Sequence, residues 1–212
     1  MPLRGTVVLL HGFARRPSAL DDLADRCSAL DAAVVRPHLS AWWWPTCTNN
    51  TRHLDRVAMR VRAERVDGPV VVVGHSAGAA AGAWIAARLA DAHVHVGALV
   101  LVDGVESPVR SISRAWPGLA GVPVTAVVGP PGPCNRQQAL GRWLVSTDAS
   151  SGPVVDVVDL PAMGHGDIEG VGVGVYVRMC GDDPSAPARE ALMAAVLDAV
   201  ERGLEAGANE SQ

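Results

Sequence analysis

A serine between two glycines follows a run of valines near the middle of the chain. The segment reads Val70-Val71-Val72-Val73-Gly74-His75-Ser76-Ala77-Gly78. A buried strand that turns directly into a helix at Gly-x-Ser-x-Gly holds the serine in a tight, strained turn and exposes its hydroxyl. The small residues Gly74 and Gly78 permit such a turn. Ser76 is therefore the candidate nucleophile.

A serine nucleophile needs a base, and one histidine follows the last predicted strand. The strand Val154–Leu160 leads into the glycine-containing loop 161–166, which holds Gly164 and His165. We interpret His165 as the base that takes the proton from Ser76 and returns it to the leaving group. His75 belongs to the serine motif, and we expect it to pack beside the turn, at the substrate pocket.

These motifs resemble the α/β-hydrolase family over most of the chain, from His11-Gly12-Phe13 to His165. In that family, the residue after His-Gly and the residue after the serine donate backbone N–H groups to the oxyanion. The resemblance implies that Phe13 and Ala77 form the oxyanion hole. It also implies a small member of the family, since the segment after Asp103 is too short for a large helical lid.

The acid of the expected triad departs from the family pattern. The family usually places it after the strand Val122–Val128, but the loop that follows here, Gly129–Asn135, contains no carboxylate. Some members carry the acid at the end of the preceding strand, where this chain has Asp103. We predict that Asp103 orients His165; Glu106, Asn135 and Asp148 are the alternatives, as is a site without an acid.

Tryptophans are the candidate wall of the substrate pocket. Trp42, Trp43 and Trp44 follow an early predicted strand, and a short loop cannot turn all three inward, so at least one is expected to line the pocket or its mouth. Covering the sheet edge is the alternative role for this run. Trp116, in the short segment after Asp103, is a further candidate for the pocket.

Composition excludes several classes of protein. The chain has 212 residues, of which 49% are hydrophobic and 19% charged, and its net charge is −4. Such a chain buries a large core, and it offers no basic surface typical of nucleic-acid binding. No segment resembles a secretory signal or a membrane span. We therefore expect a cytoplasmic protein with reduced thiols and no metal or organic cofactor. The four cysteines are too scattered for a fold held together by disulfides; they are Cys27, Cys47, Cys134 and Cys180.

The elements that must position these residues alternate along the chain. Short valine-rich runs, typical of strands buried on both faces, alternate with helical spacing. This predicts a single α/β domain over residues 1–206: about six mostly parallel strands with helices on both faces. Residues 207–212 are expected to form a disordered polar tail. The predicted strands are Thr6–Leu10, Ala33–Val35, Val70–Val73, Ala98–Val102, Val122–Val128 and Val154–Val158; the main predicted helices are His53–Val66, Ala77–Leu89 and Ala186–Leu204.

The resemblance and the residues together predict a serine hydrolase that acts on a small-molecule acyl substrate. An ester or thioester is expected first, and a lactone or amide next. One alternative is a non-hydrolytic enzyme that uses the same site to cyclise, epimerise or dehydrate a natural-product intermediate. Another is an inactive binding module that retains the pocket.

Overall fold

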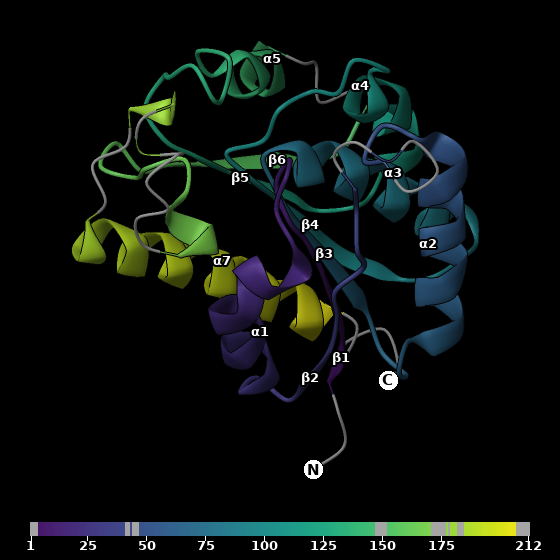
Figure 1. The fold of residues 1–212 in the computed structure, drawn as a ribbon. Coiled ribbons are helices and arrows are strands. Elements are labelled where there is room, and N and C mark those ends of the chain that lie inside the picture. The colour runs from purple at the N-terminus through teal and green to yellow at the C-terminus, as the bar shows by residue number, and fades with distance from the viewer. Residues whose placement is uncertain are drawn as a thin grey trace.

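The computed structural model describes residues 4–40, 43, 47–146, 152–170, 177, 179–181 and 185–206. Six strands form one sheet in the order β2-β1-β3-β4-β5-β6, and every neighbouring pair is parallel (Figure 1). This confirms the predicted fold class. The strands are β1 (Gly5–Leu10), β2 (Ala32–Val35), β3 (Val70–His75), β4 (Val96–Val102), β5 (Val124–Val128) and β6 (Val155–Asp159).

Helices cover both faces of the sheet and produce a three-layer architecture (Figure 1). The helices α1 and α7 pack together on one face, and α2 and α3 pack together on the other. The elements besides the strands are η1 (Pro17–Leu20), α1 (Asp21–Ser28), α2 (Thr51–Glu64), α3 (Ala77–Asp91), α4 (Ser111–Ala115), η3 (Trp116–Leu119), α5 (Ala139–Ser146), η5 (Asp167–Glu169) and α7 (Ala186–Ala206).

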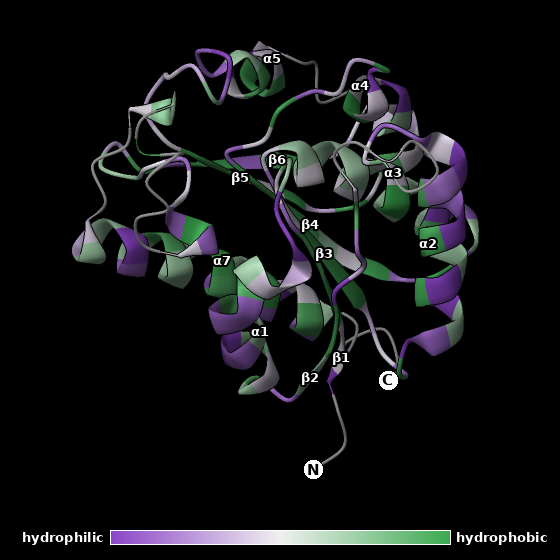
Figure 2. Cartoon of the chain, viewed as in Figure 1, coloured by the Kyte–Doolittle hydropathy of each residue, from purple (hydrophilic) through white to green (hydrophobic). Residues whose placement is uncertain are grey.

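The inner strands are buried along their whole length, as continuous valine runs predict. Every residue of β1, β3 and β4 is buried, since each of these strands has neighbours on both sides and helices on both faces. In Figure 2 these strands are hydrophobic, whereas α2 shows a hydrophilic face directed away from the sheet. The helix α2 thus contributes one apolar stripe to the core, formed by Leu54, Val57, Ala58 and Val61.

The last strand differs from this pattern. We expected Val154–Val158 to be buried on both faces, but β6 lies at the edge of the sheet and is largely exposed. Val157 retains 36% of its accessible surface. Asp156 and Asp159 interrupt the valines, and charged residues suit an edge strand because water solvates their carboxylates.

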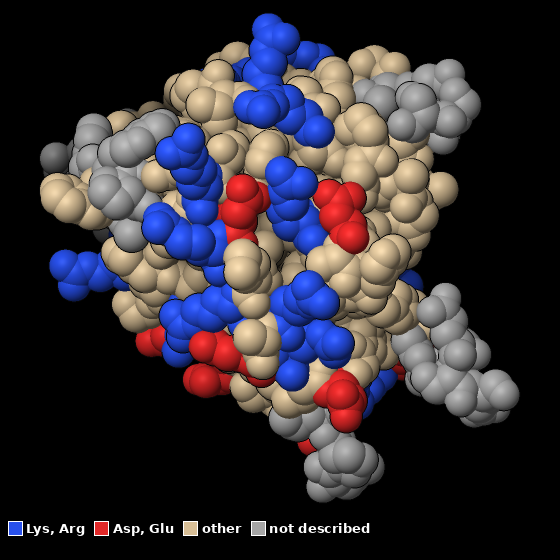
Figure 3. Space-filling model, turned by 90° about the vertical axis from the view of Figure 1, so that its right-hand side faces the viewer, with Lys and Arg blue, Asp and Glu red and all other residues tan. Residues whose placement is uncertain are grey.

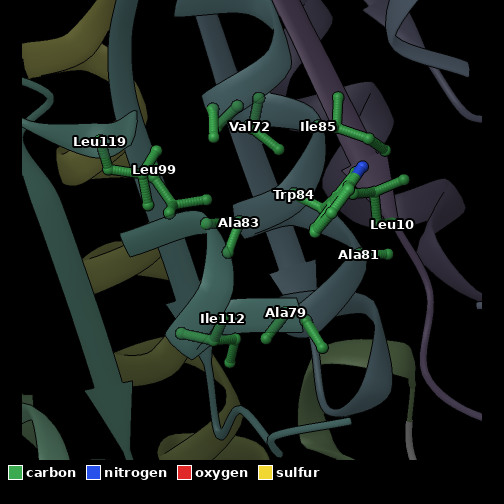
Figure 4. Packing of buried hydrophobic residues seen from close by; sticks show 14 of the residues in the cluster. Leu10, Val72, Ala79, Ala81, Ala83, Trp84, Ile85, Leu99, Ile112 and Leu119 are labelled. Carbon is green, nitrogen blue, oxygen red and sulfur yellow. The ribbon is translucent and has the colours of Figure 1, made fainter. Parts of the chain in front are cut away.

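The helix after the serine motif lies close against the sheet. Most of α3 is alanine, and its side chains Ala79, Ala83 and Ile85 form part of a core that includes Val72 and Leu99 (Figure 4). Small side chains let the helix axis approach the strands. The start of α3 is thereby fixed relative to the end of β3, which is where Ser76 lies.

Two short connections shape the edge of the sheet above the serine. Between β4 and β5 the chain forms only α4 and η3, which confirms that no large lid is inserted there. After β5 a helix appears that the sequence analysis did not predict, α5, whose buried residues include Leu140 and Leu144. Its eight residues are too few for helical periodicity to be evident in the sequence.

The cysteines correct one expectation. Cys134 and Cys180 form a disulfide, so the prediction that all four thiols are reduced is wrong. These residues are 46 positions apart and share no motif; the loop after β5 and the segment after η5 bring them together. Cys27 and Cys47 are free and buried.

None of the helices in the described ranges is long and apolar enough to cross a membrane. The predicted tail, 207–212, lies outside those ranges.

Candidate active site

Ser76 lies in a strained turn between β3 and α3. Its backbone has φ 53° and ψ −119°, a conformation rarely adopted by residues other than glycine. The turn tolerates no side chain at its flanking glycines. A Cβ on Gly74 would lie 2.4 Å from the carbonyl oxygen of Gly78, and a Cβ on Gly78 would lie 2.3 Å from the carbonyl oxygen of Leu10. The sequence therefore folds locally into the turn that its glycines permit.

Three side chains from distant parts of the chain meet at the carboxyl edge of the sheet. His165 Nε2 lies 3.0 Å from the Ser76 hydroxyl oxygen, and His165 Nδ1 lies 2.5 Å from Asp103 Oδ2. Ser76 follows β3, Asp103 follows the adjacent β4, and His165 lies in the loop after β6. All three are less than 10% exposed. The structure thus brings together the three residues predicted as nucleophile, acid and base.

The Asp103 carboxylate is held by several donors. Gln138 donates from Nε2 to Oδ1 at 2.5 Å, the Asn135 amide donates to both oxygens at 3.1 and 3.2 Å, and the Gly129 N–H donates at 3.3 Å. Burial alone would raise the pKa of Asp103, but the hydrogen bond and charge of His165, with the Asn135 and Gly129 donors, lower it below its ordinary value. Asp103 is therefore ionised at neutral pH.

The alternative acids occupy other roles in the structure. Glu106 accepts hydrogen bonds from the N–H groups of Ile112 and Ser113, and so caps the start of α4. Asn135 lies in the usual acid position of the family, but its amide contacts Asp103 and the Pro130 carbonyl. Asp148 lies outside the described residues. Among the candidates that the structure describes, Asp103 is the one hydrogen-bonded to His165.

A second charged cluster lies beside the loop that holds His165 and centres on Glu169. Its Oε1 accepts from the Gly12 N–H at 2.5 Å and lies 2.8 Å from His75 Nδ1, and its Oε2 accepts from Arg15 Nε at 2.6 Å. The other ring nitrogen of His75, Nε2, lies 2.7 Å from the carbonyl oxygen of His165. We call these four residues, Gly12, Arg15, His75 and Glu169, the Glu169 network.

The geometry of the Glu169 network fixes its protonation. Both ring nitrogens of His75 face oxygen acceptors, so both must carry a proton and the ring is an imidazolium. Burial alone would lower the pKa of His75, but the Glu169 carboxylate outweighs it and the pKa is raised. Burial would raise the pKa of Glu169, yet the charge and hydrogen bond of His75, with the Gly12 and Arg15 donors, lower it to about 2.

The Glu169 network connects the three loops of the site. Gly12 precedes Phe13, the residue that the family resemblance assigns to the oxyanion hole. His75 precedes Ser76, and its ring holds the backbone of His165 through the carbonyl oxygen. The loop after β1, the serine turn and the histidine loop are therefore held at fixed spacings by one buried carboxylate.

A third histidine, His11, is neutral. Its Nε2 accepts from the Leu39 N–H at 3.2 Å, so the proton is on Nδ1, which lies 2.9 Å from the Gly12 carbonyl oxygen. Burial lowers the pKa of His11. The ring braces the loop that leads to Phe13. Phe13 itself is 41% exposed.

The predicted pocket tryptophans are distributed differently. Trp43 is 67% exposed, and its backbone N–H bonds to the Ser40 hydroxyl at 2.8 Å. Trp42 and Trp44 lie outside the described residues. Trp116 is 5% exposed and packs edge-on against Trp143 in the core that contains α3. It was predicted as a pocket residue, and the structure places it as a core side chain.

Sequence reasoning did not identify Glu169 or Gln138. Neither residue belongs to a local motif: Glu169 lies 94 positions from His75, and Gln138 lies 35 positions from Asp103. The one available signal was the polar composition of the segments 135–138 and 165–169, which stand next to predicted active-site loops. In the described part of the chain, no group of three or more His, Cys, Asp or Glu side chains is placed to hold a metal ion.

Comparisons with known proteins identify similar structures but no similar sequences. No protein-family model matches the chain, and no curated protein matches it. The RedJ thioesterase of the prodiginine biosynthetic pathway in Streptomyces coelicolor is 15% identical, with a TM-score of 0.64 over 93% of this chain and 91% of that one. Carboxyl esterase 2 of the mycorrhizal fungus Tuber melanosporum is 15% identical, with a TM-score of 0.62 over 95% of this chain and 77% of that one.

A third similar structure is a pyrethroid hydrolase from Sphingobium faniae. It is 15% identical, with a TM-score of 0.58 over 91% of this chain and 96% of that one. At such identities the likeness concerns the fold, and the serine turn between a parallel strand and a helix agrees with it. The chain therefore has the α/β-hydrolase fold.

Proposed function

We propose that the chain is a serine hydrolase that cleaves an ester or thioester through an acyl-enzyme on Ser76. The observation that carries the proposal is the continuous chain of contacts from the Ser76 hydroxyl through His165 to the ionised Asp103. Acyl transfer by a serine uses a nucleophile in a strained turn, a buried acid and a base between the two, and Ser76, Asp103 and His165 have this arrangement. The similar structures described above are a thioesterase, an esterase and a hydrolase, and they support the same class of reaction.

In the first half of this reaction, the Ser76 oxygen attacks the acyl carbon while His165 Nε2 takes the hydroxyl proton. The imidazolium formed on His165 is stabilised by Asp103, which accepts from Nδ1. The carbonyl oxygen becomes an oxyanion, for which we assign the backbone N–H groups of Phe13 and Ala77. Ala77 is the first residue of α3, so the partial positive charge at the start of that helix favours the oxyanion as well.

The first half ends when the tetrahedral intermediate collapses and the alcohol or thiol leaves with the proton from His165. In the second half, a water molecule deprotonated by His165 attacks the acyl-enzyme, and the carboxylic acid is released as His165 returns the proton to the Ser76 oxygen. A cavity of about 250 Å³ adjoins His165, and Pro130, Pro131 and Met163 contribute to its lining. Asp103 lines this cavity as well and Ser76 does not, so the cavity lies on the Asp103 side of the base.

Covalent labelling and pre-steady-state kinetics test the proposal. A fluorophosphonate is expected to label the parent chain and to fail with Ser76→Ala. An activated ester such as p-nitrophenyl butyrate is expected to release a burst of p-nitrophenol that is equal to the enzyme concentration if deacylation is the slower step. Labelling without turnover of esters or thioesters would favour the non-hydrolytic alternative, and absence of labelling would favour the binding module.

A further inference from the structure

A second cavity, apart from the triad, lies between the start of α2 and the segment that leads into α4. Its volume is about 410 Å³. Arg52 and Arg56 line it from α2, and Val109 and Arg114 line it from the segment after β4. Among the described residues around it, none carries a carboxylate. We call this space the arginine cavity.

Two of the three arginines that line the arginine cavity carry a charge that no carboxylate of the described residues pairs with. Arg52 and Arg114 form no ion pair with any of the residues that the structure describes; Arg114 instead lies over the Trp84 ring, 5.3 Å from its centre. By contrast, the arginines farther along α2 and α3 do pair with acids: Arg60 with Glu64 at 2.9 Å, and Arg88 with Asp55 at 3.0 Å. Figure 3 shows arginines gathered on this side of the molecule.

The start of α2 adds to the positive charge of the arginine cavity. Asn50 caps the helix by accepting from the His53 N–H at 3.3 Å, so the backbone N–H groups of the first turn lie next to Arg52. A helix N-terminus carries partial positive charge. The cavity therefore combines three guanidinium groups with the positive end of a fourteen-residue helix.

The arginine cavity lies within reach of the nucleophile. The Val105 N–H donates to the Ser76 carbonyl oxygen at 3.1 Å, which fixes the start of the segment beside the serine. Val109 lies four residues farther on, so its Cα is within about 15 Å of the Cα of Val105. A coenzyme A thioester is long enough to span that distance, whereas the carboxylate of a glutarate acyl group reaches the cavity only if the cavity lies well inside this limit.

We infer that the arginine cavity binds an anionic group, a phosphate or a carboxylate, of the substrate whose acyl group reaches Ser76. The inference rests on the proposed function. Guanidinium groups match the paired oxygens of carboxylates and phosphates with two parallel hydrogen bonds, and they remain charged at every physiological pH. The preferred substrate is thus a charged acyl ester or thioester, with the negative group on either the acyl part or the leaving group.

Three substrates distinguish the source of the charge. p-Nitrophenyl butyrate is neutral, mono-p-nitrophenyl glutarate carries a carboxylate on the acyl part, and butyryl-coenzyme A carries phosphates on the leaving group. The measurement is the KM of each charged substrate relative to that of the neutral ester. In Arg52→Gln this ratio is expected to rise about fivefold for one of the charged substrates, because a partly exposed charge contact contributes roughly that factor to binding. That substrate then identifies which part bears the charge.

Arg60→Gln is the matched control, since Arg60 lies on the same helix and is exposed and paired with Glu64. Its KM ratios are expected to equal those of the parent. Adding 0.5 M salt is expected to reproduce the effect of Arg52→Gln in the parent chain, because screening weakens the same contact. Equal KM ratios in the parent, Arg52→Gln and Arg60→Gln chains would overturn the inference.

Binding without turnover separates this inference from the proposed function. In a Ser76→Ala background, inorganic pyrophosphate and glutarate are titrated by calorimetry, with and without Arg52→Gln. Weaker binding of either anion after Arg52→Gln would support the arginine cavity even if the parent chain hydrolysed none of the three substrates. Should neither anion bind, or should both bind equally well without Arg52, the cavity does not recognise anions, whatever the outcome for hydrolysis.

Discussion

Replacing Glu169 with glutamine is the most direct test of the Glu169 network. The substitution keeps the size of the side chain but removes its charge, leaving the His75 imidazolium without its counter-charge. One of the two carboxylate oxygens also becomes an NH2 group, which cannot accept a hydrogen bond. In the Oε1 position this group faces the N–H donors of Gly12 and His75, and in the Oε2 position it faces the N–H donor of Arg15. Removing one partner of a buried ion pair typically costs about 3–5 kcal/mol of folding free energy.

The lowered pKa of Glu169 gives a second value for the folding free energy that this charge contributes. It falls from an ordinary 4.5 to about 2 on folding. At about 1.4 kcal/mol for each tenfold change in proton affinity, this corresponds to roughly 3 kcal/mol. The two routes agree, so we expect Glu169→Gln to lower the free energy of unfolding by about 3 kcal/mol near neutral pH. For a chain of this length the melting temperature is then expected to fall by about 6–12 °C.

The sign of each pKa change gives a pH window. Glu169 has a lowered pKa, so its contribution is complete above 4.5 and is lost as the pH falls towards 2. His75 has a raised pKa, so its contribution is complete below 6.5 and is lost as the pH rises through its folded value. The difference in unfolding free energy between the parent and Glu169→Gln is therefore expected to be largest between about pH 4.5 and 6.5.

Urea unfolding, followed by tryptophan fluorescence at several pH values, measures this difference. The control is Glu64→Gln, which removes an exposed carboxylate paired with Arg60 on α2 and is expected to cost about 0.5 kcal/mol or less. The reasoning is refuted if Glu169→Gln costs no more than Glu64→Gln at pH 5.5. It is refuted equally if the difference between the two variants does not change from pH 5.5 to pH 3.

Three further outcomes follow from the site and the loops around it. Asp103→Asn is expected to lower kcat for an activated ester by about 10⁴-fold with an unchanged circular dichroism spectrum, while Glu106→Gln, at the start of α4, lowers it far less. Gly78→Ala is expected to abolish activity or folding because its Cβ would lie 2.3 Å from a backbone oxygen, whereas Gly82→Ala meets only side-chain atoms at 3.3 Å or more and should retain activity; assay and melting temperature compare the two. Cys134→Ser is expected to lower the free energy of unfolding by about 4 kcal/mol, from loss of a crosslink across 46 positions, and urea unfolding with and without a reductant measures it.

Elements with a strong local pattern were predictable from the sequence. The valine runs of β1, β3 and β4 predicted buried parallel strands because hydrophobic side chains on both faces require cover on both faces. The glycines around Ser76 predicted its turn, and the order of strand ends predicted that Asp103 and His165 would approach it. Each of these inferences depends only on neighbouring residues or on the order of elements along the chain, and both can be read from the sequence.

What the sequence did not predict depends on contacts between distant segments. The valines of β6 look like those of an inner strand, and only the position of β6 at the sheet edge makes them exposed. Glu169 and Gln138 carry no local signal, since their roles come from the donors and acceptors that other loops present to them. The pairing of Cys134 with Cys180 has the same origin, because it requires the position of two loops in space.

The separation of the Glu169 partners along the chain has a consequence for biosynthesis. Gly12 precedes Glu169 by 157 positions. At roughly 5–20 residues per second, a ribosome needs on the order of 10–30 s to proceed from one to the other. Until then Arg15 and His75 lack the carboxylate that balances their charge, and His165 is itself added only four residues before Glu169. The nascent chain therefore carries Ser76 through the synthesis of the next 89 residues before His165 is added, so the contacts of Ser76, His165 and Asp103 form only after the loop that follows β6 has been made.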